Sequence, residues 1–381
     1  MYVLAILIFL LALVVYNAIA KHAIDKKYQA LIMIIIFLFF AFRFGLGSDT
    51  RTYVEMYENT TKNLLFEFSS TIRYPLYNLL QSIFVNFNIS FPFFLLFLQS
   101  TSLLLIGYIV YKESDNILLS TLIVVGSGFI ESYMTSMIRQ MICMAIFFFA
   151  FYKYLKDEKY IKYYLIIFPT VLIHWVCIPL LLIPIVYYFK SKLMSKTSII
   201  MMIVFTTFAF ILLTTKIDYL LKYLPTYLSL IFSSTRQYFQ ISGLLLQVIL
   251  FAVVIFLYIF ANKKKIDDFD RFQVYLCFIS FMIYLIFINY AIISRACDFL
   301  QVIQFVLIPK LINILKYKKI QILSIFIISF INFVLITSDI KFNMEYWFYQ
   351  KSLASYPYIS IFDSGKAIEY YKFKELPKFI K

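Results

Sequence analysis

Residues 136–152 read SMIRQMICMAIFFFAFY, an apolar stretch with Arg139 near its start. Such a run approaches the roughly 20 residues that a helix needs to cross a bilayer. An arginine in hydrocarbon costs several kcal/mol, so it survives where it faces a wet cavity or a partner. The stretch therefore predicts a membrane fold and, within it, a place where a guanidinium meets an anion.

The composition predicts an all-α polytopic membrane protein. Of 381 residues, 63% are hydrophobic and only 14% are charged, whereas a soluble domain has about a quarter charged residues. The net charge of +15 lies mainly between apolar runs, where it reports topology, because lysine and arginine collect in cytoplasmic loops. We expect a bilayer as partner and no nucleic acid, since no amphipathic basic face is present.

Neither cysteine nor histidine usage favours a metal site. The chain has two histidines and four cysteines, and no CxxC spacing. A zinc site needs such ligands in clusters, and cysteines inside apolar runs argue against disulfides. We expect no metal and no other cofactor. The cysteines are Cys143, Cys177, Cys277 and Cys297.

Apolar runs and the lysines between them predict about ten full spans. The first is expected to remain uncleaved, since no basic segment precedes it. Residues 1–336 form one predicted integral-membrane domain, and 337–381 form a tail that we expect to be external. The predicted spans are 1–20, 28–44, 91–111, 117–134, 135–152, 197–215, 243–261, 272–292, 298–315 and 320–336.

One apolar segment, 163–189, has lysines at both ends and three prolines within it. A single crossing would place the later lysine clusters outside, so the charge rule favours a re-entrant hairpin with its tip near His174. A broken backbone at that depth is tolerated where it is buried in protein or lines a wet cavity.

Other segments are predicted at the outer face. Residues 50–90 alternate aromatic and polar residues as interfacial helices do. The run 45–47 uses two of seven glycines, which indicates a turn or a close approach. We also expect an external segment over 216–242 and a tight outer turn over 294–298.

Three arginines toward the outer side are candidate ligands for an anion, because a guanidinium stays charged and forks onto phosphate oxygens. Each has a structural alternative. Arg139 could pair with Glu131 in the neighbouring helix, and Arg295 with Asp298 as an i,i+3 pair. Arg43 could be an interfacial arginine whose head group reaches water.

Two further residues are candidate general bases. His174 could accept a proton or donate to phosphate, although a buried histidine is more often structural. Asp49 could be a base or bind sugar hydroxyls, but Asp49-Thr50-Arg51-Thr52 also fits a helix N-cap. Aromatic residues such as Tyr53 and Tyr74 could stack on sugars.

Several of these residues recur in one order. The order is Arg43-x-Gly45-x-Gly47-x-Asp49 with Tyr53, then Tyr74-Pro75-Leu76-Tyr77-Asn78-Leu79-Leu80, Ile138-Arg139-Gln140, His174, and Arg295-x-x-x-Phe299 with Pro309. Over residues 30–310 this pattern resembles the EpsG family of Wzy-like polymerases. The chain departs from the family at Tyr74, where a glutamate is frequent, and at Val176, where a serine is frequent.

The resemblance implies a metal-independent glycosyltransferase in the bacterial cytoplasmic (inner) membrane. It implies that repeat units on undecaprenyl diphosphate are joined outside into capsule, exopolysaccharide or O-antigen, beside a flippase and a chain-length regulator. The alternatives are a flippase or transporter of lipid-linked oligosaccharide, an O-antigen ligase and an acyltransferase. The implied catalytic residues are His174 and Asp49, and the implied substrate ligands are Arg43, Arg139, Gln140, Arg295, Tyr53 and Tyr74.

Overall fold

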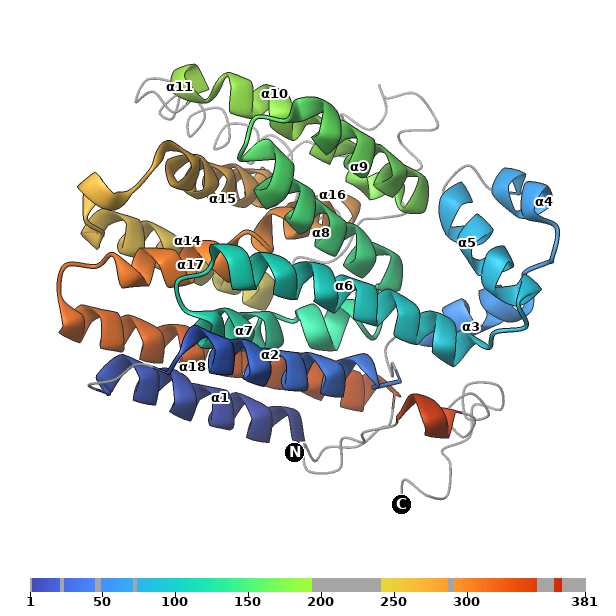
Figure 1. The fold of residues 1–381 in the computed structure, drawn as a ribbon, viewed down its shortest axis with the longest axis horizontal. Helices are drawn as coiled ribbons and strands as arrows, with labels where there is room; N and C mark the ends of the chain where they lie inside the picture. The colour runs from blue at the N-terminus through green and yellow to red at the C-terminus, as the bar shows by residue number, and fades with distance from the viewer. Residues whose placement is uncertain are drawn as a thin grey trace. The chain divides into compact units, whose positions relative to one another are not determined.

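The described part of the chain is helical in a computed structural model (Figure 1). Within it, β-type pairing is limited to two isolated bridges, so the predicted all-α class is confirmed. Chain contacts define two compact units: unit 1 is residues 1–175 with 317–381, and unit 2 is residues 176–316. The structure describes residues 2–20, 24–44, 49–70, 74–193, 241–286, 291–347 and 360–364.

Unit 1 is built around α7 (Ile117–Gly126), all of whose residues are buried. A helix that is apolar on every side must be covered on every side, and α7 packs against α1, α2 and α18. Helix α6 packs against both α2 and α8, and α8 also packs against α9. The other elements of this unit are α1 (Tyr2–Ile19), α2 (Lys26–Ala41), α3 (Thr50–Glu58), α4 (Leu64–Ser69), α5 (Pro75–Asn86), α6 (Phe91–Glu113), η1 (Phe129–Tyr133), α8 (Ile138–Ala150), η2 (Phe151–Leu155), α9 (Tyr160–Ile173), α18 (Lys318–Trp347) and η6 (Ile361–Asp363).

Five helices in the described residues are long and apolar enough to cross a bilayer, which makes the chain a membrane protein. They match five of the predicted spans, while the count of about ten stays a prediction. The predicted span at 197–215 and most of the external segment 216–242 lie outside the described residues. The five are Tyr2–Ile19, Phe91–Glu113, Ile138–Leu155, Arg295–Asn313 and Lys318–Thr337.

The predicted span over 117–134 is not one continuous α-helix. Helix α7 ends at Gly126, and at about 1.5 Å per residue it covers only half of the hydrocarbon core. Gly128 then takes a positive φ of 79°, which disfavours any residue with a Cβ. The π-helical turn η1 follows and carries Glu131 before α8 begins. Irregular turns of this kind interrupt helices at functional sites.

A second glycine fixes how α7 packs. A Cβ at Gly126 would lie 2.4 Å from the Cβ of Asn332 in α18, a distance that real side chains do not adopt. Gly107 in α6 differs, since a Cβ there would meet Phe37 and Met33 of α2 at 3.4–3.5 Å, in ordinary contact. Gly126 thus permits a close approach of two helix backbones.

The helices predicted over residues 50–90 are present as α3, α4 and α5, and their place at the outer face, after which we call them the outer helices, stays a prediction. An aromatic cluster anchors them to the start of α6: the Tyr57 and Phe94 ring centroids lie 5.3 Å apart, and those of Tyr77 and Phe94 lie 5.8 Å apart. The Tyr57 hydroxyl also donates to the Ile89 carbonyl at 2.5 Å. Burial raises the pKa of Tyr57 to about 12, so its hydroxyl stays protonated.

The C-terminal segment that is described returns to the end of α2. The Ile361 amide donates to the Phe42 carbonyl at 2.9 Å, and Ser360 forms a bridge with Arg43. Phe362 stacks on Phe42 with ring centroids 5.9 Å apart. Residues 360–364 therefore lie at the end of α2 where the outer helices begin.

Unit 2 contains a polar contact that ties two helices together. Lys310 of α17 reaches the buried carboxylate of Asp270 in α15 at 2.7 Å. The predicted outer turn over 294–298 is wrong, because these residues belong to α16. The elements of this unit are η3 (Trp175–Leu182), whose first residue is assigned to unit 1, α10 (Ile183–Tyr188), α11 (Lys190–Leu193), α14 (Ile241–Phe260), η4 (Lys263–Lys265), α15 (Asp268–Ile286), α16 (Ala291–Gln301) and α17 (Gln304–Asn313).

The predicted break near His174 is present. Helix α9 ends at Ile173, His174 is extended, and a 3-10 helix starts at Trp175. The boundary between the two units falls just after Trp175. Whether the segment 163–189 turns back within the bilayer stays a prediction.

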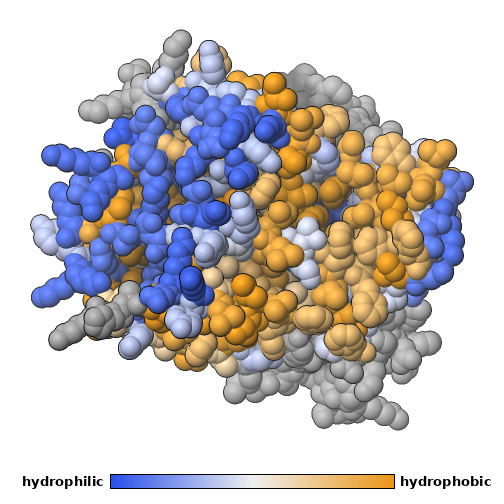
Figure 2. All heavy atoms as spheres, in the orientation of Figure 1, coloured by the Kyte–Doolittle hydropathy of each residue, from blue (hydrophilic) through white to orange (hydrophobic). Residues whose placement is uncertain are grey.

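Large apolar side chains are exposed where lipid is expected. Ile35 of α2, Leu104 of α6 and Ile161 of α9 are more than half exposed. Figure 2 shows hydrophobic residues gathered in a broad area of one face, with hydrophilic residues beside it. Between α2 and α6, Phe37 and Gly107 line an apolar groove of about 420 Å³. These surfaces suit a hydrocarbon environment.

Candidate functional site

Arg139 lies at the N-terminal end of α8, as its second residue. The preceding Met137 makes no side-chain cap for the helix. A helix N-terminus carries partial positive charge, which disfavours a cation and favours an anion. Arg139 and the end of α8 therefore add to one positive region.

Three tyrosines surround the guanidinium of Arg139, and we call Tyr53, Tyr74 and Tyr77 the tyrosine cluster. The guanidinium carbon lies 4.1 Å from the ring centroid of Tyr74, 5.4 Å from that of Tyr53 and 5.6 Å from that of Tyr77. The Nε of Arg139 also donates to the Tyr53 hydroxyl at 3.4 Å. Ring faces attract a cation without neutralising it.

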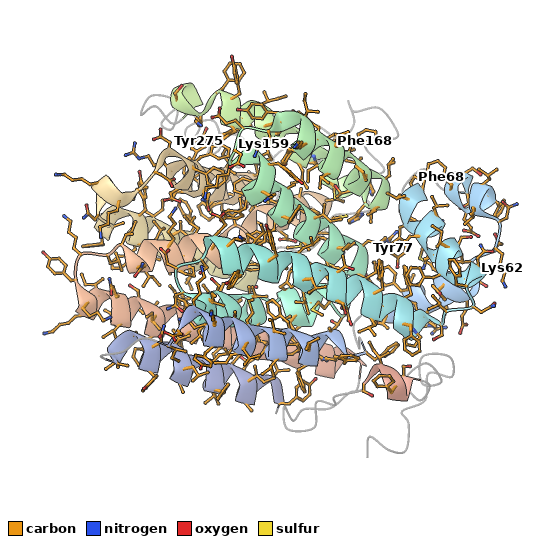
Figure 3. All side chains as sticks on the ribbon, in the orientation of Figure 1. Lys62, Phe68, Tyr77, Lys159, Phe168 and Tyr275 are labelled. Carbon is orange, nitrogen blue, oxygen red and sulfur yellow. The ribbon has the colours of Figure 1, made fainter. Side chains whose placement is uncertain are left out.

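The cluster comes from two outer helices that meet α8. Tyr53 lies in α3, Tyr74 immediately precedes α5, and Tyr77 lies in its first turn. Tyr53 and Tyr77 are buried, whereas Tyr74 is partly exposed. Figure 3 labels Tyr77, on the side of α5 that faces α6 and α8. The outer helices thus hold aromatic faces over the start of α8.

Arg139 keeps donor capacity in this arrangement. Its side chain is half-buried, and its Nη1 is buried without a hydrogen-bond partner among the described residues. In the same part of the chain, no carboxylate forms an ion pair with it. A planar guanidinium with unused N–H groups can fork onto an anion.

The charge of Arg139 also affects its neighbours. Burial, helped by the nearby Tyr53, raises the pKa of Tyr77 well above its usual range, although the charge of Arg139 acts in the opposite direction. The Tyr77 hydroxyl is therefore protonated near neutral pH and can donate a hydrogen bond.

His174 and Arg139 lie at the same height along the paired helices α8 and α9 of unit 1. The Cys143 thiol of α8 contacts the Thr170 carbonyl of α9 at 3.6 Å. The two helices run in opposite directions, so one turn back from Cys143 reaches Arg139 and one turn on from Thr170 reaches His174. Helix α5 also packs on α9. The structure thus brings His174, Arg139 and the tyrosine cluster to one end of the α8–α9 pair.

Asp49 belongs to the same neighbourhood. It occupies the N-cap position of α3, as the sequence predicts, but its side chain makes no cap hydrogen bond. The next residue, Thr50, donates to the Thr135 carbonyl at 2.8 Å, in the turn that leads to α8. One helical turn further on, Tyr53 contacts Arg139.

Arg43 has a different environment. It is 2% exposed, which rules out the predicted alternative of an interfacial arginine reaching water. Its Nη1 lies 2.5 Å from Oε1 of Glu131, and both side chains are buried. The Tyr2 ring centroid is 5.6 Å from its guanidinium carbon. Glu131 therefore pairs with Arg43 at the end of α2. The alternative considered from the sequence, a pair between Glu131 and Arg139, is not formed.

Two other candidates remain, Gln140 in unit 1 and Arg295 in unit 2. Gln140 is buried beside Arg139 in α8, but successive helical side chains point about 100° apart. Arg295 is partly exposed in α16 of unit 2. The predicted turn at Gly45 and Gly47 lies outside the described residues.

Tyr77 is the site residue that the sequence did not single out. Its spacing could have identified it. Tyr77 follows Tyr74 by three residues, and residues three apart lie on the same face of a helix. The sequence likewise gave Arg43 and Glu131 separate roles. Pairs this far apart in a chain have no local signature.

Comparison with known proteins gives one family. The model of the EpsG family matches residues 26–351. No curated protein and no solved structure shows a significant match to the chain.

Proposed function

Because the chain belongs to the EpsG family, a family of Wzy-like polymerases, we propose that it joins oligosaccharide repeat units carried on undecaprenyl diphosphate. The reaction would take place at the outer face of the bacterial cytoplasmic membrane and extend a capsule, exopolysaccharide or O-antigen chain. The partners in this proposal are the lipid-linked oligosaccharide, the bilayer, a flippase that supplies repeat units and a chain-length regulator.

One observation carries the proposal. Arg139 stands at a helix N-terminus, held by three aromatic rings and without a carboxylate in the described part of the chain. A cation left with its charge and its donors is suited to an anionic ligand. The substrate of a polymerase of this class presents such a ligand as its diphosphate.

The chemistry of transfer then assigns Arg139 a role. The acceptor hydroxyl oxygen attacks the anomeric carbon of the sugar next to the diphosphate, and that carbon's bond to the diphosphate oxygen breaks. The acceptor proton passes to a base, and undecaprenyl diphosphate leaves with the electron pair. Fixed positive charge beside the departing oxygen stabilises the transition state, and we assign this role to Arg139. No metal enters the proposal.

The base is proposed from the same neighbourhood. Histidine is the side chain whose ordinary pKa lies nearest neutral pH, and His174 is level with Arg139. Asp49 is the other candidate, one turn from Tyr53. The two make different predictions: His174→Gln abolishes transfer if His174 is the base, and Asp49→Asn does so if Asp49 is.

The remaining candidates receive supporting roles. Tyr53 and Tyr74 present ring faces on which sugars can stack beside Arg139. We propose Arg43 as a positioning residue, because Glu131 already occupies its guanidinium. Gln140 and Arg295 stay proposed substrate ligands.

The direct test uses purified protein in lipid vesicles. Lipid-linked repeat units would be extracted from a strain that lacks this protein and supplied to it, and the products separated on a gel. We expect a ladder of glycans that differ by one repeat unit. Unchanged repeat units after incubation with folded wild-type protein would reject the proposal.

The same preparation separates the rival functions. A flippase would move fluorescent repeat units between leaflets without making a ladder, and interrupted helices such as α7 with η1 also occur in transporters. A ligase would attach finished chains to a different acceptor and leave polymer length unchanged. An acyltransferase would consume an acyl donor.

A further inference from the structure

Helix α5 carries an unusual set of buried polar groups. The Tyr77 hydroxyl, the Asn78 Oδ1 and the Gln81 Nε2 are all buried without a hydrogen-bond partner among the described residues. Tyr77 and Gln81 are each 1% exposed, and Asn78 is 8% exposed. Buried polar atoms are nearly always paired, so three on one short helix need an explanation.

These three residues lie on one face of α5. At about 100° per residue, Gln81 projects about 40° from Tyr77, and Asn78 projects about 100° from it. Tyr77 faces Arg139, as their 5.6 Å contact shows. The Asn78 amide nitrogen donates to Ser70 at 3.1 Å, which leaves its oxygen unused. The face therefore begins at Arg139 and extends along α5.

The chemistry of this face differs from that of a phosphate site. Gln81 offers a donor, Tyr77 offers a hydroxyl that stays protonated because burial raises its pKa, and Asn78 offers an acceptor. A diphosphate presents acceptors alone, so it cannot satisfy the Asn78 oxygen. Sugar hydroxyls both donate and accept, and they match the whole set.

We propose that Tyr77, Asn78 and Gln81 form a sugar subsite that binds hydroxyl groups of the residue attached to the diphosphate. The assignment rests on the proposed function, in which Arg139 holds that diphosphate. Tyr74 and Arg139 are partly exposed and border the face, and in this proposal the ligand approaches from their side.

The test measures binding of two probes to the purified protein in nanodiscs. One probe is the lipid-linked repeat unit extracted from a strain lacking this protein, and the other is undecaprenyl diphosphate without sugar. Tyr77→Phe and Gln81→Met should each weaken binding of the repeat unit roughly five- to tenfold. Binding of undecaprenyl diphosphate should be unchanged, because Arg139 remains.

Tyr57→Phe is a matched control. Tyr57 belongs to the same aromatic cluster, but its hydroxyl already donates to Ile89. Its removal should lower thermal stability and leave both affinities unchanged. Tyr77→Phe should have the opposite signature, with equal or higher stability, because an unpaired polar atom is removed.

The outcomes separate the two proposals. Selective loss of repeat-unit binding supports the subsite. An equal loss for both probes, or no loss for either, overturns it, while wild-type binding and polymerisation leave the proposed function intact. If the wild-type protein binds neither probe, the proposed function itself fails.

Discussion

The end of α2 and the start of α8 each hold a partly or fully buried arginine in unit 1, but in different surroundings. At the first, a carboxylate meets Arg43 at 2.5 Å and both side chains are hidden. At the second, aromatic rings hold Arg139, which keeps its charge and unused donors. The same residue type is thus a structural tie in one place and a candidate ligand in the other.

The difference follows from what each partner does to a guanidinium. A carboxylate cancels the charge, and removing it leaves a buried, uncompensated ion. An aromatic ring attracts the cation through its quadrupole and leaves the charge in place. Stability should therefore depend on Arg43, and activity on Arg139.

The largest expected effect is at Glu131. Glu131→Gln leaves Arg43 buried without its counter-ion and should destabilise the protein by about 3–5 kcal/mol. Thermal unfolding in detergent measures this loss. Combining it with Arg43→Gln should recover much of the stability, since two neutral amides can share a hydrogen bond. Equal stability of Glu131→Gln and the wild type would show that the ion pair is not a structural tie.

Arg139→Lys should have the opposite profile. A lysine keeps the charge but not the fork, and loss of such a transition-state contact costs about 10²–10³-fold in rate. Chain synthesis in the vesicle assay measures the rate, and unfolding should be close to the wild type. Arg51→Lys is the control, because Arg51 forms an exposed i,i+4 pair with Glu55, and such pairs contribute little. Wild-type synthesis by Arg139→Lys would remove Arg139 from the mechanism.

Local sequence properties predicted much of this fold. Apolar length and flanking lysines located the five long helices, since both are properties of consecutive residues. Arg139 could be identified because a charged residue inside an apolar run is apparent from the sequence alone. The outer helices also followed from local patterning.

Partners and interruptions were harder to predict. Glu131 is near Arg139 in sequence, yet it pairs with Arg43, 88 residues away. The polar run at 294–298 suggested a turn, but a helix such as α16 can carry polar residues on one face. Helix α7 ends early, and Gly128 follows it with a positive φ. The residue pattern did not predict this conformation.

A smaller effect is expected from the packing that precedes the η1 turn. Gly126→Ala forces a Cβ against Asn332 and should destabilise by about 1–3 kcal/mol. Gly107→Ala is the matched control, because its Cβ meets only ordinary contacts, and alanine favours a helix by about 0.5–1 kcal/mol over glycine. If both substitutions lower the unfolding temperature equally, the close approach of α7 and α18 does not specifically stabilise the part of unit 1 around Glu131.

The smallest effect tests the aromatic side of the comparison. Tyr74→Phe keeps a ring at 4.1 Å from Arg139 and should change activity little, whereas Tyr74→Leu removes the cation–π contact, worth about 0.5–2 kcal/mol. We expect roughly two- to thirtyfold weaker repeat-unit binding for Tyr74→Leu, with Tyr28→Leu at an exposed position of α2 as the control. If Tyr74→Phe and Tyr74→Leu lose affinity equally, the hydroxyl group matters and the ring face does not. In that case the tyrosine cluster would hold Arg139 by hydrogen bonds. Cation–π contacts would then not explain how Arg139 keeps its charge.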